Sequence, residues 1–231
     1  MSTPDEILQS FRAEIDAIDE QVARLLVQRI GIIQQVAELK RQHWPKTCHI
    51  RPGREGQMHR AILQRFTGTG FPPLTALAIW RQLIGGSTHI ESPLVATVID
   101  QDHRFLVREY FGLQAPVSTA QNFADALDRV KTGGANLLVL PSPDISDWWK
   151  NARMIQDAGL AIFASLPLVE GTLPAGVRPA VALAALAPEA SGDDISYYVN
   201  GGKLEKFDGF IEGRDGIFLG AHPRPIALRT T

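Results

Sequence analysis

The stretch that decides the fold is Asp5 to Gln42, DEILQSFRAEIDAIDEQVARLLVQRIGIIQQVAELKRQ. It contains no proline and its only glycine is Gly31, so it predicts one long helix. At about 1.5 Å per residue this helix is roughly 55 Å long, more than a small domain can cover. We therefore expect most of it to pack against a second copy of the chain. Its apolar residues recur in alternating steps of four and three, which is typical of a helix packed along a narrow seam: Phe11, Ile15, Ile18, Val22, Leu25, Ile32, Val36 and Leu39.

One charged residue interrupts this seam. The pattern requires an apolar residue between Leu25 and Ile32, but the chain has Arg29 there. Arg12 and Lys40 are 28 residues apart, four whole heptads, so both lie on the same edge of the seam. If two copies ran antiparallel and crossed near the middle of the helix, Arg12 of one would lie beside Lys40 of the other. A charge on a packed seam is costly unless it is paired. Two interpretations therefore stay open: an acidic side chain faces Arg29 in a coiled-coil dimer, or an anionic ligand does.

Composition excludes several classes of protein. The chain has 231 residues, 45% of them hydrophobic, and a net charge of -2, which indicates a globular protein of one large or two small domains. It has no basic stripe for nucleic acid, no signal peptide and no transmembrane run, so we expect no nucleic-acid or membrane partner. The single cysteine, Cys48, excludes an internal disulfide and favours a cytoplasmic location. The six histidines show no ligand spacing, so no metal or cofactor is predicted.

Two shorter helices are predicted after the first, Arg54 to Phe66 and Leu74 to about Ser92. Three helices of such different lengths do not close a core alone, which again favours an intertwined dimer. The pattern changes at Pro93. We therefore predict an all-α domain over 1–92 and a smaller α/β domain over 93–231.

Strands and helices alternate in the second domain, and this alternation predicts a parallel sheet. From Pro179 on, short apolar runs are separated by glycine-rich turns, which indicates a strand-rich end. The predicted strands are 94–99, 136–140, 160–166, 181–187, 195–199 and 217–221, and the predicted helices are 104–112, 122–132 and 145–158. The predicted fold class is thus α followed by α/β.

The first 92 residues closely resemble the all-helical, type II chorismate mutases. Four segments carry the resemblance: Phe11 to Asp19, Leu25 to Arg29, Val36 to Lys40 and the pair Arg54-Glu55. The resemblance implies an intertwined helical homodimer with sites shared between protomers. It also implies the rearrangement of chorismate to prephenate, in phenylalanine and tyrosine biosynthesis, without a cofactor. It favours an anionic ligand as the partner of Arg29.

The chemistry of chorismate suits these residues. Chorismate is a small dianion that rearranges within itself, so a protein must hold its shape and stabilise charge on the ether oxygen. The guanidinium group binds carboxylates with two parallel hydrogen bonds. The resemblance implies the following roles: Arg29 and the partner's Arg12 hold carboxylates, Lys40 reaches a carboxylate and the ether oxygen, Glu55 accepts the ring hydroxyl, Arg54 supports the site, and Ser87 lines it.

Two positions depart from the pattern of the family. Arg51 stands where family members often have an acidic residue that helps to bind the ring hydroxyl, and Glu91 stands where a glutamine often donates to the ether oxygen. A glutamate donates a hydrogen bond only when protonated, so we expect activity to rise as pH falls. Both departures concern efficiency more than the type of reaction.

The second half resembles the first lobe of prephenate dehydratase more weakly. Two stretches follow its outline, 102–112 and 124–141. The glycine-rich opening of that lobe is replaced by Ile99 to Asp102, and Val177-Arg178-Pro179 stands near the place of its Thr-Arg-Phe motif. We therefore expect a truncated lobe with part of an ACT-like regulatory fold at its end, without dehydratase activity. The pair Trp148-Trp149 is interpreted as packing.

Two other functions remain as alternatives. One is a lyase of the same fold that removes pyruvate from isochorismate. The other is a non-catalytic dimerisation or regulatory module, which would not need Arg29 on its seam.

Overall fold

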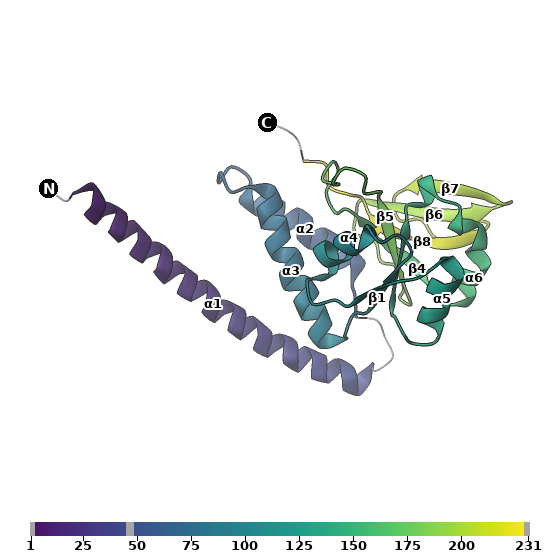
Figure 1. Ribbon diagram of the computed structural model, residues 1–231, viewed down its shortest axis with the longest axis horizontal. Helices are drawn as coiled ribbons and strands as arrows, with labels where there is room; N and C mark the ends of the chain where they lie inside the picture. Colours follow the sequence, from purple (N-terminus) through teal and green to yellow (C-terminus); the bar gives the residue numbers. More distant parts are fainter. Residues whose placement is uncertain (1–2, 45–48, 229–231) are drawn as a thin grey trace. The chain divides into compact units, whose positions relative to one another are not determined.

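The computed structural model describes residues 3–44 and 49–228 (Figure 1). The chain divides into two compact units, Met1–Pro45 and Lys46–Thr231, and each is described by itself. Cys48, the single cysteine, lies outside the described residues. The predicted boundary at residue 92 separates two family resemblances, whereas these units separate two compact bodies. That boundary stays a prediction.

The first unit is one helix, α1 (Pro4–His43), as predicted from its apolar period. A capping box begins it: the Glu6 backbone N–H donates to the Thr3 hydroxyl at 3.3 Å, and the Thr3 N–H donates to the Glu6 carboxylate at 2.8 Å. The Trp44 N–H ends it by donating to the Lys40 carbonyl at 2.7 Å. Acidic residues in the first turn and basic residues in the last complement the helix dipole.

The apolar seam of α1 is largely exposed. Seven of its eight predicted positions are exposed, from 49% for Val22 to 63% for Leu25. Large apolar side chains aligned along one helix at this exposure mark a surface that another protein covers. The intertwined dimer stays a prediction, and this exposure motivates it. The seven residues are Phe11, Ile15, Ile18, Val22, Leu25, Ile32 and Leu39.

The second unit opens with α2 (Pro52–Phe66) and α3 (Pro73–Glu91). Both helices pack against each other and against the α/β part of the same chain, α3 on α4 (His103–Phe111) and α2 on β8 (Ile217–Pro223). We expected a second copy of the chain to close this helical core. The structure shows that the α/β part covers one side of α2 and α3, and closure of the helical core by a second copy stays a prediction.

Glycines permit this close packing. A Cβ atom at Gly56 of α2 would lie 2.7 Å from Cγ of Pro223. A Cβ atom at Gly85 of α3 would collide with the Phe111 carbonyl, which is backbone and cannot rotate away. The neighbouring Gly86 has open space, with only Nε2 of Gln114 at 3.9 Å from such an atom. Gly85 is therefore the point where α3 touches the end of α4.

This pair of glycines gives a matched test of the packing. We expect Gly85→Ala to lower the free energy of unfolding by about 1–3 kcal/mol, because an added methyl group overpacks a tight contact. Gly86→Ala should be neutral or stabilising by up to about 1 kcal/mol, since alanine favours the helix. Urea denaturation of both variants measures the difference. Equal effects of the two substitutions would contradict the close contact between Gly85 and the Phe111 carbonyl.

The sheet has eight strands in the order β2-β1-β3-β5-β4-β8-β6-β7. β1 is parallel to β2 and β3, and β4 is parallel to β8, but β5 is antiparallel to both β3 and β4, and β6 is antiparallel to β7 and β8. The sheet is therefore mixed, and the expectation of a parallel sheet is correct only for β1, β2 and β3 and for the β4–β8 pair. The strands are β1 (Ala96–Val98), β2 (Val117–Thr119), β3 (Leu137–Pro141), β4 (Ala161–Leu166), β5 (Ala180–Ala184), β6 (Asp194–Asn200), β7 (Lys203–Asp208) and β8.

Helices cover both faces of the sheet (Figure 1). One core contains Leu106 and Phe111 of α4 together with Phe163 of β4. The other contains Leu127 of α5 (Phe123–Lys131) and Ile155 of α6 (Ala152–Asp157). Each face of the sheet thus has its own apolar core.

The predicted helix over 145–158 is only partly correct. Its α-helical part is the short α6, and two 3₁₀ turns, Pro143–Ile145 and Trp148–Asn151, precede it. The Trp148 indole is buried and donates to the Pro141 carbonyl at 2.7 Å, which holds this segment against the end of β3. The aromatic pair was predicted to pack, and Trp148 does so.

Two strands were missed, β2 and β7, and both lie at edges of the sheet. Edge strands bury little of their surface, so their apolar pattern is weak. The polar, partly exposed sequence of β7 shows this.

Candidate functional site

The eight predicted site residues are divided between the two units. Three cations lie on α1, and the other five residues lie at the start of α2 or on α3. Each group is therefore considered within its own unit, and their union in one site stays a prediction. The first group is Arg12, Arg29 and Lys40, and the second is Arg51, Arg54, Glu55, Ser87 and Glu91.

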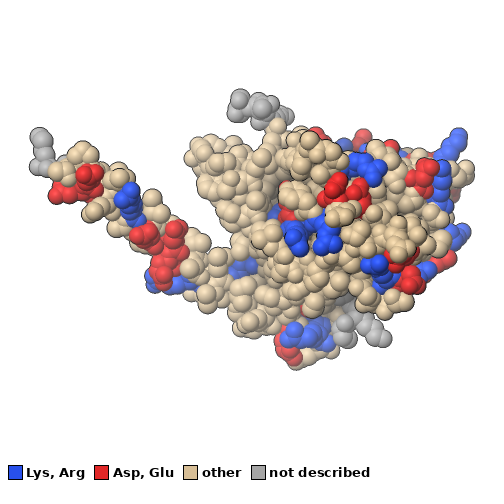
Figure 2. All heavy atoms as spheres, viewed as in Figure 1, with Lys and Arg blue, Asp and Glu red and all other residues tan. Residues whose placement is uncertain are grey.

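The cations of α1 differ in their surroundings. Arg12 is exposed and forms no hydrogen bond or ion pair with any residue of the described ranges, whereas Arg29 and Lys40 are half-buried. The nearby Arg24 pairs with Glu20 of its own helix at 3.2 Å. Arg12 is therefore available to an anion, while Arg24 is compensated locally. Figure 2 shows acidic and basic residues interspersed along α1 and over the visible face of the second unit.

Glu55 is buried in an ion pair that the sequence analysis did not foresee. Its Oε2 accepts from Nη1 of Arg81 at 2.7 Å, and the two residues are only 6% and 4% exposed. Arg81 also donates through Nε to the Tyr110 carbonyl at 2.8 Å, and its Cζ lies 3.8 Å from the centroid of the Tyr110 ring. The pair thus joins α2, α3 and α4. The only sequence signal was a cation within the apolar stretch from Leu77 to Ile84.

His59 completes this buried cluster. Its Nε2 lies 3.2 Å from Nη1 of Arg81. Burial, with Arg81 and Arg60 nearby, lowers the pKa of His59 from 6.5 to about 3. The imidazole is therefore neutral at neutral pH, and its ring nitrogen can accept from the guanidinium.

The neutral state of His59 makes stability depend on pH. In the unfolded chain the imidazole takes up a proton as pH falls through about 6.5, but in the folded chain it resists until about 3, so unfolding becomes more favourable over this window. We expect the free energy of unfolding to decrease with acidification, and His59→Gln to make the decrease shallower. Urea denaturation across this pH range measures the slopes. His43→Gln on exposed α1 is the control, and an equal change in slope for both variants would count against His59.

Arg51 is already engaged within its unit. Its Nε donates to Oε1 of Glu189 at 2.5 Å. Glu189 precedes β6 in the chain, so this contact links the start of α2 to the α/β part. The carboxylate that family members often carry at position 51 is thus replaced by a cation with its own acidic partner. Arg54, three residues on, is exposed.

The two candidates on α3 are less exposed. Ser87 is buried, and its hydroxyl donates to the Leu83 carbonyl at 2.5 Å, one turn back on the same helix. Glu91 is half-buried at the last position of α3. The roles of Ser87 and Glu91 in a substrate site stay predictions.

A second cluster lies at the end of β1. Nη2 of Arg178 donates to Oδ2 of Asp100 at 2.8 Å, and Nε2 of the buried His103 lies 3.1 Å from the Arg178 carbonyl. Burial opposes ionisation of Asp100, but hydrogen bonds from Arg178 and the Asp102 backbone hold its pKa below the usual value. Arg178 is thus the cation of the Val177-Arg178-Pro179 segment, and Asp100 compensates it.

Within 3–44 and 49–228, no three His, Cys, Asp or Glu side chains gather closely enough to hold a metal ion. No helix of these ranges is both long and apolar enough to cross a membrane.

Comparison with known families assigns the helical region. Residues 11–92 match the family model described as chorismate mutase type II. The chain therefore carries a type II chorismate mutase domain spanning most of α1 and all of α2 and α3, which confirms the resemblance drawn from the sequence. All eight predicted site residues fall within the matched range.

Two relatives with a described function share only about a quarter of the aligned residues with this chain. The chain is 28% identical over 143 residues to "Bifunctional chorismate mutase/prephenate dehydratase" of Aquifex aeolicus (strain VF5), covering 59% of this chain and 39% of that protein. It is 25% identical over 150 residues to the protein of the same description from Stutzerimonas stutzeri, covering 61% and 40%. The chain thus spans about two fifths of the length of these relatives. Both alignments are longer than the helical domain, so the similarity continues beyond it.

One solved structure also aligns with the chain. It is described as "GqqA- a novel type of quorum quenching acylases" and shares 14% identity, with a TM-score of 0.40 over 57% of this chain and 95% of that one. Such a TM-score does not establish a common fold.

Proposed function

We propose that this protein is a chorismate mutase, which rearranges chorismate to prephenate in the biosynthesis of phenylalanine and tyrosine. One observation supports the proposal: the range that matches the type II family model contains Arg12, Arg29 and Lys40, at the spacing that the sequence resemblance implies. Arg12 and Arg29 hold the two carboxylates, and Lys40 reaches a carboxylate and the ether oxygen. No bond to the protein forms, because the substrate reacts within itself and needs only positioning and electrostatic stabilisation.

The proposed site is shared between two copies of the chain. The exposed apolar seam of α1 supports this arrangement, because two such seams bury each other in an antiparallel pair. The partner's Arg12 then complements Arg29 and Lys40 of the first copy. Dimerisation through α1 follows from the same seam that places Arg29 among apolar neighbours.

A single assay separates the proposed function from its alternatives. Purified protein is given chorismate, and the loss of chorismate absorbance is followed together with the formation of prephenate. In parallel it is given isochorismate, and pyruvate is measured. Release of pyruvate without prephenate formation would favour the lyase. Folded protein that turns over neither substrate would favour a non-catalytic module. Prephenate should not be converted to phenylpyruvate above the uncatalysed rate.

Glu91 is expected to make the activity depend on pH. In the proposed site it stands beside the ether oxygen, where only a protonated carboxyl group donates a hydrogen bond to the developing charge. We expect kcat to rise as pH falls in the wild type, and Glu91→Gln to flatten this rise while keeping or increasing activity near neutral pH. The pH–rate profiles of the two proteins are the measurement. Superimposable profiles would remove Glu91 from the site.

A further inference from the structure

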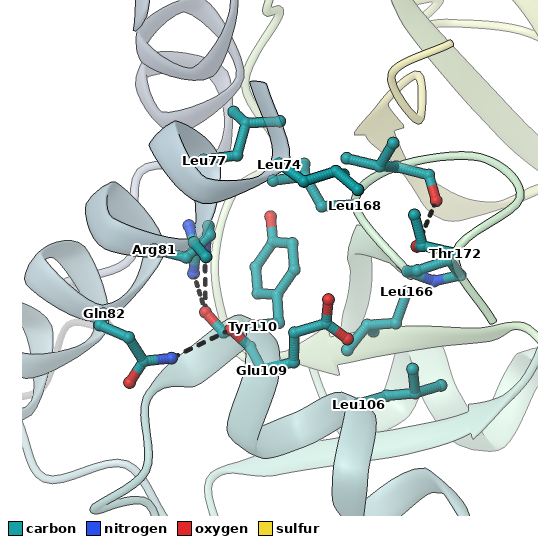
Figure 3. A pocket seen from close by; sticks show the side chains of 13 residues that line it. Leu74, Leu77, Arg81, Gln82, Leu106, Glu109, Tyr110, Leu166, Leu168 and Thr172 are labelled. Carbon is teal, nitrogen blue, oxygen red and sulfur yellow. Dashed lines mark hydrogen bonds between the residues drawn. The ribbon is translucent and has the colours of Figure 1, made fainter. Parts of the chain in front are cut away.

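A small cavity lies in the second unit, between α3, α4 and the segment that follows β4 (Figure 3). Its volume is about 210 Å³, below the roughly 300–1,000 Å³ of pockets for drug-sized ligands. Most of its wall is apolar, with Leu74 and Leu77 from α3 and Leu168 from the segment after β4. A small ligand with an apolar body fits such a wall.

The hydroxyl of Tyr110 faces this cavity. Tyr110 is only 5% exposed, and its ring stands within the cavity with the hydroxyl toward Leu74 and Leu168 (Figure 3). None of the described residues hydrogen-bonds this hydroxyl, so its oxygen is open to a ligand in the cavity. Burial raises the pKa of Tyr110 to about 12, so the group is a neutral phenol with a free oxygen acceptor.

Glu109 brings a negative charge to the same cavity. Its side chain lines the cavity with the carboxyl group toward Leu166 (Figure 3), and burial raises its pKa above the usual value. No cation of the described ranges forms an ion pair with it. The nearest candidate in the wall, Arg81, is already committed to Glu55 and to the Tyr110 carbonyl. Glu109 is therefore an exposed carboxylate that forms no ion pair within residues 3–44 and 49–228.

We propose that this cavity binds a small apolar primary amine in its protonated form. The ammonium group donates to the Glu109 carboxylate and to the Tyr110 hydroxyl oxygen, which together use two of its three donors. The apolar body of the ligand covers the leucine side chains. The proposal goes beyond the mutase activity, because a carboxylate in the wall repels a dianion such as chorismate.

The test measures binding to the full chain by isothermal titration calorimetry. Three probes of similar size differ in charge: 2-phenylethylamine is a cation, 2-phenylethanol is neutral, and phenylacetate is an anion. We expect saturable binding of the amine with a stoichiometry of about one per chain. The alcohol should bind roughly tenfold or more weakly, because it lacks the charge-assisted hydrogen bond to Glu109. Phenylacetate should bind most weakly.

Three variants locate the amine. Glu109→Gln removes the charge of an exposed side chain that lines the cavity, and should weaken amine binding roughly tenfold or more. Tyr110→Phe removes only the hydroxyl and should weaken binding by a smaller factor. Ala78→Phe places a ring in the cavity from the exposed side of α3 and should abolish binding. Glu205→Gln, on β7, is the matched control and should bind as the wild type does.

Circular dichroism establishes that each variant is folded before titration. Equal binding of amine and phenylacetate would overturn the proposal, as would amine binding that Glu109→Gln and Ala78→Phe leave unchanged. Absence of amine binding to the folded wild type would overturn it too. Chorismate turnover measured on the same samples keeps this proposal separate, because failure of amine binding leaves the mutase assay unaffected.

Discussion

Replacing Arg29 with alanine is expected to lower kcat/KM for chorismate by a factor of about one hundred or more. Arg29 occupies a position on α1 where the apolar seam requires a hydrophobic residue, and in the proposed site it holds a substrate carboxylate with two hydrogen bonds. Loss of a few kcal/mol of charge-assisted binding in the transition state corresponds to this factor. Initial rates of chorismate loss measure it, and size-exclusion chromatography establishes the oligomeric state of the variant.

The control for Arg29 is another arginine of the same helix. Arg24 is exposed and pairs with Glu20, so Arg24→Ala should leave the rate close to that of the wild type. Mixing Arg12→Ala with Arg29→Ala provides a second test. If each site takes Arg12 from one chain and Arg29 from the other, mixed dimers regain one intact site and part of the activity. Unchanged activity in Arg29→Ala would refute the proposed role, and no recovery after subunit exchange would refute the shared site.

Replacing Glu55 with glutamine is expected to lower the free energy of unfolding by about 3–5 kcal/mol. This substitution keeps the size of the side chain but leaves Arg81 as a buried charge without its carboxylate, and breaking one side of a buried ion pair costs this amount. Chemical denaturation measures the loss. Glu20→Gln, which breaks an exposed pair on α1, should cost less than about 1 kcal/mol.

The double variant Glu55→Gln with Arg81→Met measures how much the two side chains stabilise each other, apart from what each contributes alone. We expect the double variant to be less destabilised than the sum of the single variants, because removing both charges leaves neither one uncompensated. Strict additivity would show that the two groups do not interact. Activity per folded molecule tests the other role of Glu55: if it accepts the ring hydroxyl of chorismate, Glu55→Gln lowers kcat/KM beyond the loss of folded protein.

The helical part of the fold could be predicted because its information is local. The apolar period from Phe11 to Leu39 predicted α1 to within one residue at each end, and a proline stands at the first position of both α2 and α3. The α/β part was harder. Nothing near β5 in the sequence indicates that it would pair antiparallel with both β3 and β4, since strand direction depends on where the chain returns.

The candidate site was likewise predictable only where it depends on residues of one helix. The spacing of Arg12, Arg29 and Lys40 along one helix is readable from the sequence and lies within the matched range, and their roles stay a prediction. The environment of Glu55 cannot be predicted from the sequence, because its partner Arg81 lies on α3 and also donates to the carbonyl of Tyr110 in α4. Ion pairs and hydrogen bonds between side chains of three different elements produce no repeating pattern in the sequence. The cavity that we propose to bind an amine is likewise formed by α3, α4 and the segment after β4.

The packing of α2 on β8 has a consequence for the order in which the molecule is made. α2 begins at Pro52, whereas β8 ends at Pro223 and lies inside the sheet, between β4 and β6. A ribosome exposes α2 long before it exposes β8, and the chain emerges at about 5–20 residues per second. The nascent α2–α3 hairpin therefore waits, with its apolar face uncovered, for a strand synthesised more than a hundred residues later. During that interval the surface of α2 that later packs on β8 is open to other proteins, including chaperones.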